Sequence, residues 1–367
     1  ILMENREILE ARVGVPLKLM SVADIDLEKD RGLQLDESIL TSDAFQVVNN
    51  PEVDIVVEMI GGDGIAKALI LKAMENGKQV VTANKALLAK HGNHLFKTAV
   101  DSGVDLAYEA SVGGCMPIIK TLRESLVGNR IQSMTGILNG TCNYILSKIT
   151  DEGIEFDAAL AKAKANGYAE ADPTLDVEGF DTAHKLAILT SLGYGMEINF
   201  DDIYIEGISK VTPLDIAFAG QFGYRIKLLA ITKAGENSVE ARVHPAMIPF
   251  GNLLSNVNST LNAITVTADA VGDILLYGHG AGMMPTASAV IGDIVDIGRN
   301  LLKNASGRVP LMSYQMDRVK RLPVTPIRDI TTHYYFRFSA QDKPGVLSAI
   351  SGILGKHGIS LKSVNQK

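Results

Sequence analysis

The first third of the chain alternates short apolar runs with segments of helical periodicity. The apolar runs, which predict strands, lie at 17–23, 53–59, 79–82 and 104–108. The segments whose apolar side chains recur every three to four positions, which predicts helices, lie at 3–12, 65–76 and 86–100. Uninterrupted apolar strands that alternate with helices are typical of βαβ units, in which helices cover both faces of a parallel sheet. This α/β pattern predicts a doubly wound, Rossmann-type nucleotide-binding domain.

From residue 113 onward the order of elements changes, which predicts a second domain of α+β type. Segments that predict helices lie at 117–126, 142–149, 156–165, 179–192 and 287–302. Segments that predict strands lie at 131–138, 221–231, 239–244, 264–270 and 271–277. We expect these strands to form a sheet that serves as the floor of a substrate site or as a dimer interface.

A polar linker with two prolines, 318–329, precedes a smaller C-terminal piece. Its predicted elements are a strand at 333–339, an amphipathic helix at 345–357 and the start of a strand at 359–364. This partial βαβ segment is too small to bury its own faces. We therefore expect a nucleotide-binding domain at 1–111, a substrate and dimerisation domain at 112–317, a linker at 318–330 and a regulatory segment at 331–367. The helix near 283–305 is expected to pack back on the first domain.

Ligands of doubly wound sheets bind beyond the carboxyl ends of the strands. Asp26, Gly61, Thr82 and Lys85 follow predicted strands at this edge. An acid such as Asp26 can accept hydrogen bonds from an adenosine ribose, although acids are also common in solvated loops. Such a domain normally begins with a strand and a GxGxxG turn, and we expect both to precede the given sequence.

Composition excludes several classes of protein. The 367 residues suffice for two or three domains with cores of their own. Lys and Arg number 35 against 42 Asp and Glu, a net charge of −7, and no long basic block suggests a nucleic-acid partner. No apolar stretch reaches the roughly 18 residues of a membrane span, and the start does not resemble a signal peptide, so we expect a cytoplasmic protein. The two cysteines, Cys115 and Cys142, form neither a disulfide framework nor a CxxC metal site.

Two lysines are candidates for proton chemistry. Asp181 and Lys185 are four positions apart in a predicted helix, so they lie on one face with the acid on the N-terminal side. An exposed pair of this kind contributes under about 1 kcal/mol, but this helix is mostly apolar, which favours a cleft in which the ammonium can hold or release a proton. Lys85 is either a solvated helix-start lysine or a residue at the reactive ring of a cofactor.

These residues belong to a longer pattern that resembles the homoserine dehydrogenase family. Residues 163–185, AKANGYAEADPTLDVEGFDTAHK, reproduce the spacing of the family signature. The resemblance continues through VTANK (81–85), EASVGG (109–114), GILNGTCNYIL (136–146), VHPAMIP (243–249), GHGAGMMPTASAVIGD (278–293) and NASGRVP (304–310). It covers nearly the whole chain.

The resemblance implies the reversible, NAD- or NADP-dependent interconversion of L-homoserine and L-aspartate 4-semialdehyde in the biosynthesis of threonine, methionine and isoleucine. It implies that Lys185 is the proton donor, that Asp181 orients it, and that Lys85 acts beside the substrate hydroxyl and the nicotinamide. The implied substrate-binding residues are Glu170, Asp176, Thr141 and Tyr168. The implied cofactor-binding residues are Asp26, Gly61, Thr82, Lys85, Gly167, Glu170 and Gly280.

The resemblance also implies a sodium ion, a regulatory module and an oligomer. The implied sodium ligands are Glu109, Val112, Gly114 and Met116. Ile25 stands where relatives that favour NADP often carry arginine, so we expect a preference for NAD. Residues 340–354 resemble the start of an ACT domain, which implies threonine as an effector, although a packing extension is an alternative. We expect a homodimer or homotetramer.

Two other interpretations predict different chemistry. An aldehyde dehydrogenase that uses Cys115 as its nucleophile would need a partner that activates the thiol, and the sequence places no histidine nearby. An amino-acid-binding regulatory protein derived from a dehydrogenase would not need to retain Lys85, Asp181 and Lys185. A turnover assay with homoserine and NAD⁺ distinguishes an enzyme from such a binding protein.

Overall fold

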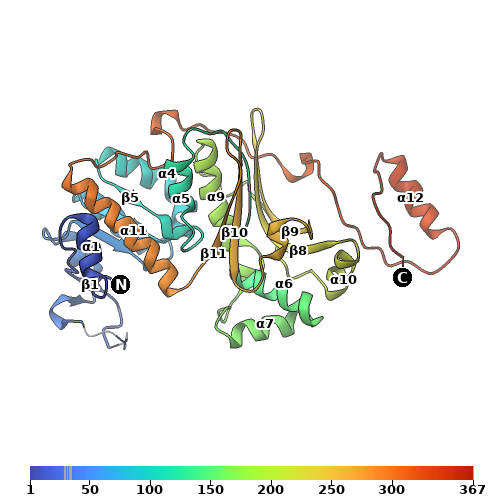
Figure 1. Cartoon of the computed structure of the whole chain (residues 1–367), viewed down its shortest axis with the longest axis horizontal. Helices are drawn as coiled ribbons and strands as arrows, with labels where there is room; N and C mark the ends of the chain where they lie inside the picture. The colour runs from blue at the N-terminus through green and yellow to red at the C-terminus, as the bar shows by residue number, and fades with distance from the viewer. Residues whose placement is uncertain (29, 31, 33–34, 367) are drawn as a thin grey trace.

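The computed structural model describes residues 1–28, 30, 32 and 35–366 (Figure 1). A three-stranded parallel sheet forms the centre of the N-terminal part, in the order β3 (Ile55–Glu58), β4 (Gln79–Thr82) and β5 (Leu106–Ala107). Two short strands, β1 (Val22–Ala23) and β2 (Leu40–Thr41), pair in parallel with each other. The helices of this part are α1 (Arg6–Val13), η1 (Glu37–Ile39), α2 (Ala44–Asn49), α3 (Ile65–Glu75), α4 (Lys85–Asp101) and η2 (Glu109–Ser111).

Helices cover both faces of the parallel sheet. Val80 of β4 packs in one apolar cluster with residues of α3 and α4, whereas Val81 packs in another with Val290, Ile294 and Ile297. Because successive strand residues point to opposite faces, these clusters lie on opposite sides of the sheet. The second cluster comes from α11 (Met283–Leu302), which returns from far along the chain and also contacts α1. The predicted α/β, doubly wound fold class is confirmed.

The middle of the chain forms a six-stranded sheet in the order β11-β10-β6-β8-β9-β7. Its strands are β6 (Ile131–Ile137), β7 (Tyr204–Ile205), β8 (Tyr224–Ala234), β9 (Val239–Pro249), β10 (Leu261–Ala268) and β11 (Gly272–His279). All neighbours run antiparallel except β7 and β9. The helices of this part are α5 (Ile118–Lys120), the π-helical η3 (Thr121–Ser125), α6 (Gly140–Glu152), α7 (Phe156–Ala165), α8 (Thr174–Val177), α9 (Phe180–Tyr194), α10 (Pro213–Gln221) and η4 (Leu253–Asn256).

Helix α9 lies between the two halves of the molecule. It contacts α4 on one side and strands β8 and β9 on the other, and every residue from Asp181 to Gly193 is buried. A helix that is apolar around most of its circumference is typical of such a central position. The first turn of α9, which carries the candidate lysine, therefore lies where the nucleotide-binding part meets the substrate part.

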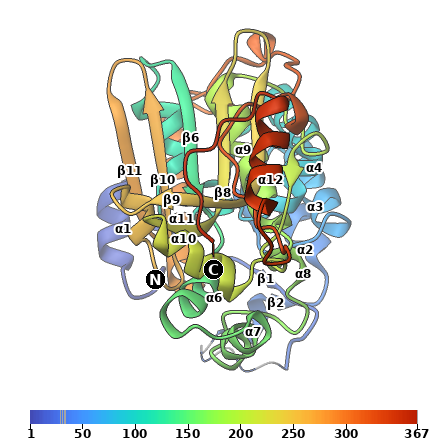
Figure 2. The ribbon, with the colours of Figure 1, turned by 90° about the vertical axis from the view of Figure 1, so that its right-hand side faces the viewer.

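The C-terminal segment differs from its prediction. It contains η5 (Met316–Arg318), η6 (Ile327–Asp329) and α12 (Val346–Lys356). Helix α12 stands apart from the sheets in Figure 1, and Figure 2 views the molecule from the side on which it lies. The predicted strands at 333–339 and 359–364 are wrong for the described residues, as is most of the strand predicted at 17–23. Alternation of side chains does not form a strand without a partner backbone, and neither C-terminal segment pairs with another strand in the described chain. Instead, Tyr335 and Arg337 donate hydrogen bonds to Asp215 at the start of α10, at 3.0 and 2.7 Å.

No helix among the described residues is long and apolar enough to cross a membrane.

Candidate functional site

Asp181 lies between the two candidate lysines. Its Oδ2 accepts a hydrogen bond from Lys185 Nζ at 2.7 Å, and its Oδ1 is 2.9 Å from Lys85 Nζ. Lys185 Nζ also donates to the carbonyl oxygen of Leu138 at 2.6 Å. The Lys185 side chain is 8% exposed and the Lys85 side chain 38%, so one ammonium is enclosed and the other reaches towards solvent. One carboxylate thus holds two cations at the junction of α4 and α9.

Helix starts bring the three residues together. Lys85 is the first residue of α4, whose preceding Asn84 accepts a hydrogen bond from Leu87 N at 3.1 Å and caps the helix. Asp181 lies in the first turn of α9, where the helix dipole favours a carboxylate. Gly179 begins that helix with a φ of 87°, and a Cβ there would lie 3.2 Å from Val243, so a residue larger than glycine would push α9 away from the sheet.

Charge and burial oppose each other in this cluster. Burial alone would raise the pKa of Asp181, but the charges of Lys185 and Lys85 outweigh it and hold this pKa well below its usual range. Burial would lower the pKa of Lys85, but the charge of Asp181 outweighs it and raises this pKa above its usual value. Both groups are therefore ionised at neutral pH, so the cluster presents fixed ammonium groups to a ligand.

Asn139 extends the cluster towards α6. Its Nδ2 donates to Asp181 Oδ2 at 2.9 Å and to Asp176 Oδ1 at 2.7 Å, and its Oδ1 caps α6. Burial raises the pKa of Asp176, the charge of Asp181 adds to this effect, and the hydrogen bond from Asn139 opposes it. Thr141, at the start of α6, donates to the carbonyl oxygen of Tyr168 at 2.6 Å. The structure thus joins Asp176 and Thr141, two of the predicted substrate residues, to the lysine pair.

Glu58 organises the predicted cofactor edge of the parallel sheet. It is 4% exposed at the end of β3, and its Oε1 accepts hydrogen bonds from Ile60 N and Gly61 N at 2.8 and 3.0 Å. Its Oε2 accepts a hydrogen bond from the Thr82 hydroxyl at 2.7 Å. Gly61 and Thr82, which the sequence placed at the cofactor, are therefore held together beside the start of α4.

Other predicted residues lie outside these networks. Asp26 is exposed in the turn after β1, where its backbone N donates to Asp24 Oδ1 at 3.0 Å. Gly167 and Glu170 are exposed in the loop after α7, although the charge of Glu170 acts on Lys85. The Tyr168 side chain is 45% exposed and packs against the ring of Tyr144.

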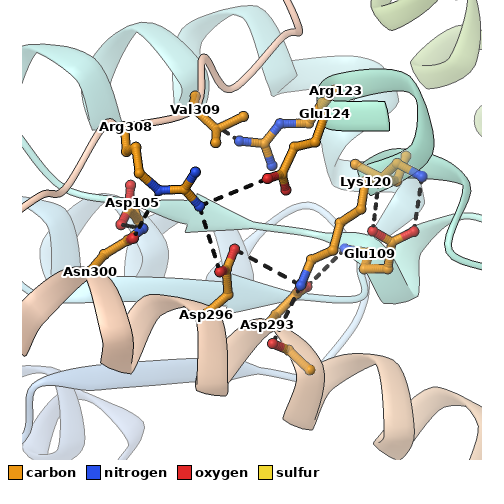
Figure 3. A network of polar contacts seen from close by, with 12 residues as sticks. Asp105, Glu109, Lys120, Arg123, Glu124, Asp293, Asp296, Asn300, Arg308 and Val309 are labelled. Atoms are coloured by element: carbon orange, nitrogen blue, oxygen red, sulfur yellow. Dashed lines mark hydrogen bonds and ion pairs between the residues drawn. The ribbon is translucent and has the colours of Figure 1, made fainter. Parts of the chain in front are cut away.

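One of the predicted sodium residues, Glu109, carries a buried carboxylate (Figure 3). Glu109 is 5% exposed, and its two carboxylate oxygens accept hydrogen bonds from Ile119 N and Lys120 N at 2.8 and 2.9 Å. Burial raises the pKa of Glu109 to about 7, with a further contribution from Asp293. Gly114 has a φ of 57°, and a Cβ there would lie 2.7 Å from the carbonyl oxygen of His279. A larger residue at position 114 would therefore separate the loop from the segment that carries Gly280.

Sequence reasoning missed the residues that connect these groups. Asn139 and Glu58 each join two candidate residues and Asp293 contacts one, Glu109, but none of the three stands at a spacing that signals chemistry. Glu58 and Asp293 carried one available signal, since each is an acid inside an apolar run that predicts burial. A buried acid needs hydrogen-bond donors or cations nearby.

Sequence profiles of known families match three parts of the chain. Residues 117–295 match homoserine dehydrogenase, residues 2–109 match the NAD-binding domain of homoserine dehydrogenase, and residues 334–367 match the ACT domain. The homoserine dehydrogenase of Pseudomonas aeruginosa is 50% identical over 328 residues, which cover 89% of this chain and 76% of that protein.

Solved structures show the same relationship. The crystal structure of a homoserine dehydrogenase from Thiobacillus denitrificans is 45% identical, with a TM-score of 0.93 over 100% of this chain and 84% of that one. A hyperthermophilic archaeal homoserine dehydrogenase in complex with NADPH is 29% identical, with a TM-score of 0.62 over 71% of this chain and 75% of that one. The chain belongs to the homoserine dehydrogenase family of NAD(P)-dependent oxidoreductases that act on a CH–OH group.

Proposed function

We propose that Lys185 donates the proton to the aldehyde oxygen when L-aspartate 4-semialdehyde is reduced to L-homoserine, and removes it in the reverse direction. The observation that carries this proposal is the contact of one carboxylate, Asp181, with both ammonium groups at 2.7 and 2.9 Å. NAD(P), when bound, supplies or accepts the hydride. As negative charge builds on the substrate oxygen, Lys85 and Lys185 stabilise it before the proton moves.

Polar groups around the pair suit an amino-acid substrate. Asp176 and Glu170 are proposed to bind the ammonium group of the substrate. Thr141 and the backbone of Tyr168 are proposed to line the same side of the substrate site. Asp176 is half-buried and is linked through Asn139 to Asp181, so a bound substrate would lie beside the proton donor. The test is the absorbance of reduced nicotinamide when the protein is mixed with L-homoserine and NAD⁺. A protein that only binds amino acids would produce no reduced nicotinamide, and its absorbance would not rise.

We further propose that the cofactor is NAD in preference to NADP. Asp26 is exposed, and its backbone N contacts the carboxylate of Asp24. Ile25, which stands between them, is 94% exposed and has no charge on its side chain. A 2′-phosphate at this turn would approach the carboxylates of Asp24 and Asp26, and contact between like charges is unfavourable.

The expected result is a kcat/KM several-fold higher with NAD⁺ than with NADP⁺. Ile25→Arg should narrow this difference by improving the use of NADP⁺ alone, because the guanidinium pairs with phosphate. Ile25→Gln, of similar length but without charge, is the control. A higher kcat/KM with NADP⁺ in the unmodified enzyme contradicts the proposal.

The loop 109–116 is proposed to hold a sodium ion through the carboxylate of Glu109 and the carbonyl oxygens of Val112, Gly114 and Met116. Oxygen ligands suit a hard cation. Within the described residues, the carbonyl oxygens of Val112 and Gly114 accept no hydrogen bond, and both residues are buried. The Met116 carbonyl oxygen accepts a hydrogen bond from Ile118 N at 2.7 Å and offers its second lone pair. With Glu109 and the carbonyl oxygens of Val112 and Gly114, the donor set fits a small cation, whose role when bound is to fix the loop against the segment that carries Gly280.

The C-terminal segment is proposed to report threonine to the catalytic domains. Its contacts with the substrate domain include those of Tyr335 and Arg337 with Asp215, which lies in the first turn of α10, and α10 packs against α6. Since α6 starts at the residues that follow Asn139, a shift of α10 would reach the lysine pair through that asparagine.

Saturating threonine is expected to lower activity, and Arg337→Gln should reduce that inhibition. Arg328→Gln is the control, since Arg328 is exposed and pairs with its neighbour Asp329. If threonine neither changes the activity nor gives a heat of binding, the segment does not sense threonine and serves in assembly instead. We also propose that the protein is cytoplasmic and forms a homodimer or homotetramer. Its molar mass in solution, measured by light scattering, tests the oligomeric state.

A further inference from the structure

Helix α11 and the segment before it hold the loop 109–116 at two places (Figure 3). In the middle of the helix, Asp293 Oδ2 accepts a hydrogen bond from Glu109 N at 2.9 Å. Before the helix, Gly114 packs so closely on Gly280 that a Cβ would lie 2.8 Å from the Gly280 carbonyl carbon. The position of the loop therefore depends on α11 at Glu109 and on the segment before α11 at Gly114.

Lys120 links the two buried carboxylates. Its backbone N donates to Glu109 Oε2 at 2.9 Å, and its Nζ lies 3.4 Å from Asp293 Oδ1. The same ammonium donates to the carbonyl oxygen of Gly292 at 3.4 Å and lies 4.0 Å from the half-buried Asp296. One residue thus connects the end of α5, the loop and α11.

The charges of this cluster do not balance. Glu109 and Asp293 are 5% and 1% exposed, and in the described part of the chain Lys120 alone forms an ion pair with Asp293, while Glu109 forms none. The nearby guanidinium of Arg123 donates instead to the carbonyl oxygens of Val309 and Pro310. When both carboxylates are ionised, they carry one negative charge more than the single ammonium of Lys120 balances. A bound monovalent cation would neutralise this excess and favour the ionised form of Glu109.

We infer that Asp293 and Lys120 are positioning residues that set the affinity of the loop 109–116 for Na⁺, and that they act in opposite directions. This inference rests on the proposed sodium site. Asp293 anchors the backbone of Glu109 and adds negative charge, which attracts the cation. Lys120 also anchors the loop, but its ammonium repels the cation. The Asp293 side chain is 2% exposed and the Lys120 side chain 31%, so solvent screens the charge of Asp293 weakly and that of Lys120 more strongly.

The test measures Na⁺ binding to the intact enzyme in two ways. One is the rise in unfolding temperature as NaCl replaces choline chloride at constant ionic strength, and the other is the Na⁺ concentration for half-maximal activity. Asp293→Asn keeps an acceptor for Glu109 N but removes the charge, and should raise the half-saturating Na⁺ concentration roughly tenfold. Lys120→Met keeps the stem and the backbone N–H, and should lower that concentration by a similar factor.

Opposite shifts separate positioning by charge from a merely structural role, which would weaken Na⁺ binding in both variants. Arg308→Met is the matched control, because Arg308 contacts Asp296 at 3.8 Å from a half-exposed position and should leave Na⁺ affinity within twofold. If Asp293→Asn does not fold, the tighter Na⁺ binding expected of Lys120→Met decides the matter.

The outcomes distinguish the inference from the sodium site itself. Shifts in the same direction, or no shift in variants of an enzyme that responds to Na⁺, overturn the roles of Asp293 and Lys120 and leave the sodium site standing. The sodium site, and this inference with it, is overturned if neither measurement on the unmodified enzyme responds to Na⁺ and the Glu109→Gln variant gives the same result.

Discussion

Replacing Lys185 by methionine is expected to lower kcat about 10²- to 10⁴-fold, the range that a positioned general acid typically contributes. Methionine fills the space of the lysine stem in this buried position, so the fold should persist. Cofactor affinity, measured by the fluorescence of bound NADH, should change little because Lys185 lies on α9 and not at the edge of the parallel sheet. Near-normal turnover would show that another group donates the proton.

Lys185→Arg separates proton donation from charge. Arginine retains a cation and hydrogen-bond donors but does not release a proton at neutral pH. If Lys185 acts as an acid, turnover falls in this variant as well, whereas a purely electrostatic role would be partly rescued. Lys78→Met is the control, since Lys78 is equally buried but donates to carbonyl oxygens of the nucleotide-binding part. It should cost stability without slowing turnover of the folded enzyme.

Apolar periodicity predicted most of the elements because burial on both faces leaves a strong pattern. Strand β4 and helices α3 and α4 lie within a few residues of their predicted bounds. The pattern was wrong where a partner decides the structure, as at 333–339, whose alternating aromatic residues find no neighbouring strand in the described chain. It also missed the π-helical turn at η3, because a local change of winding leaves the apolar spacing nearly intact.

In the candidate site, too, contacts within one helix could be predicted from the sequence, whereas contacts between distant segments could not. The spacing of Asp181 and Lys185 within one helix predicted their contact, which the structure confirms at 2.7 Å. The contact with Lys85 is 96 positions distant in sequence, and no periodicity signals it; it arises because α4 and α9 begin at the same junction. Asn139 was missed for a similar reason, since a neutral amide that bridges two acids has no sequence signature of its own.

Replacing Asp181 by asparagine is expected to have the second large effect, because it removes the one charge that the two lysines share. Without it, the buried ammonium of Lys185 has only neutral acceptors among the described residues, the Leu138 carbonyl oxygen and the new amide oxygen, and it lies close to a second ammonium. Breaking a buried ion pair on one side typically costs about 3–5 kcal/mol of stability. The measurement is chemical denaturation at pH 7, with Asp176→Asn as the control because Asp176 contacts neither lysine.

The loss should depend on pH in a definite direction. The pKa of Asp181 is lower in the folded protein than its usual value, so its ionised form stabilises the fold above about pH 4, and this contribution is lost as the pH falls further. The difference in stability between the unmodified enzyme and Asp181→Asn should therefore shrink on acidification. A difference that stays constant from pH 7 to pH 3 would mean that the carboxylate charge does not stabilise the fold.

The pH dependence of catalysis should also reveal the effect of the Asp181 charge on the lysines. Asp181 raises the pKa of Lys85 against the effect of burial, so Asp181→Asn leaves that burial and the repulsion between the two ammonium groups unopposed. Lys85, whose ammonium stabilises the developing charge on the substrate oxygen, then loses its proton at lower pH, and the alkaline limb of the kcat/KM profile should move down by at least about one pH unit. Asp176→Asn should raise KM for the amino-acid substrate and move that limb less than Asp181→Asn does, because Asp176 acts on Lys85 through its charge alone and forms no ion pair with it among the described residues. If Asp181→Asn lowers kcat without moving the limb, Asp181 orients Lys185 by geometry alone, and its charge does not set the protonation of Lys85.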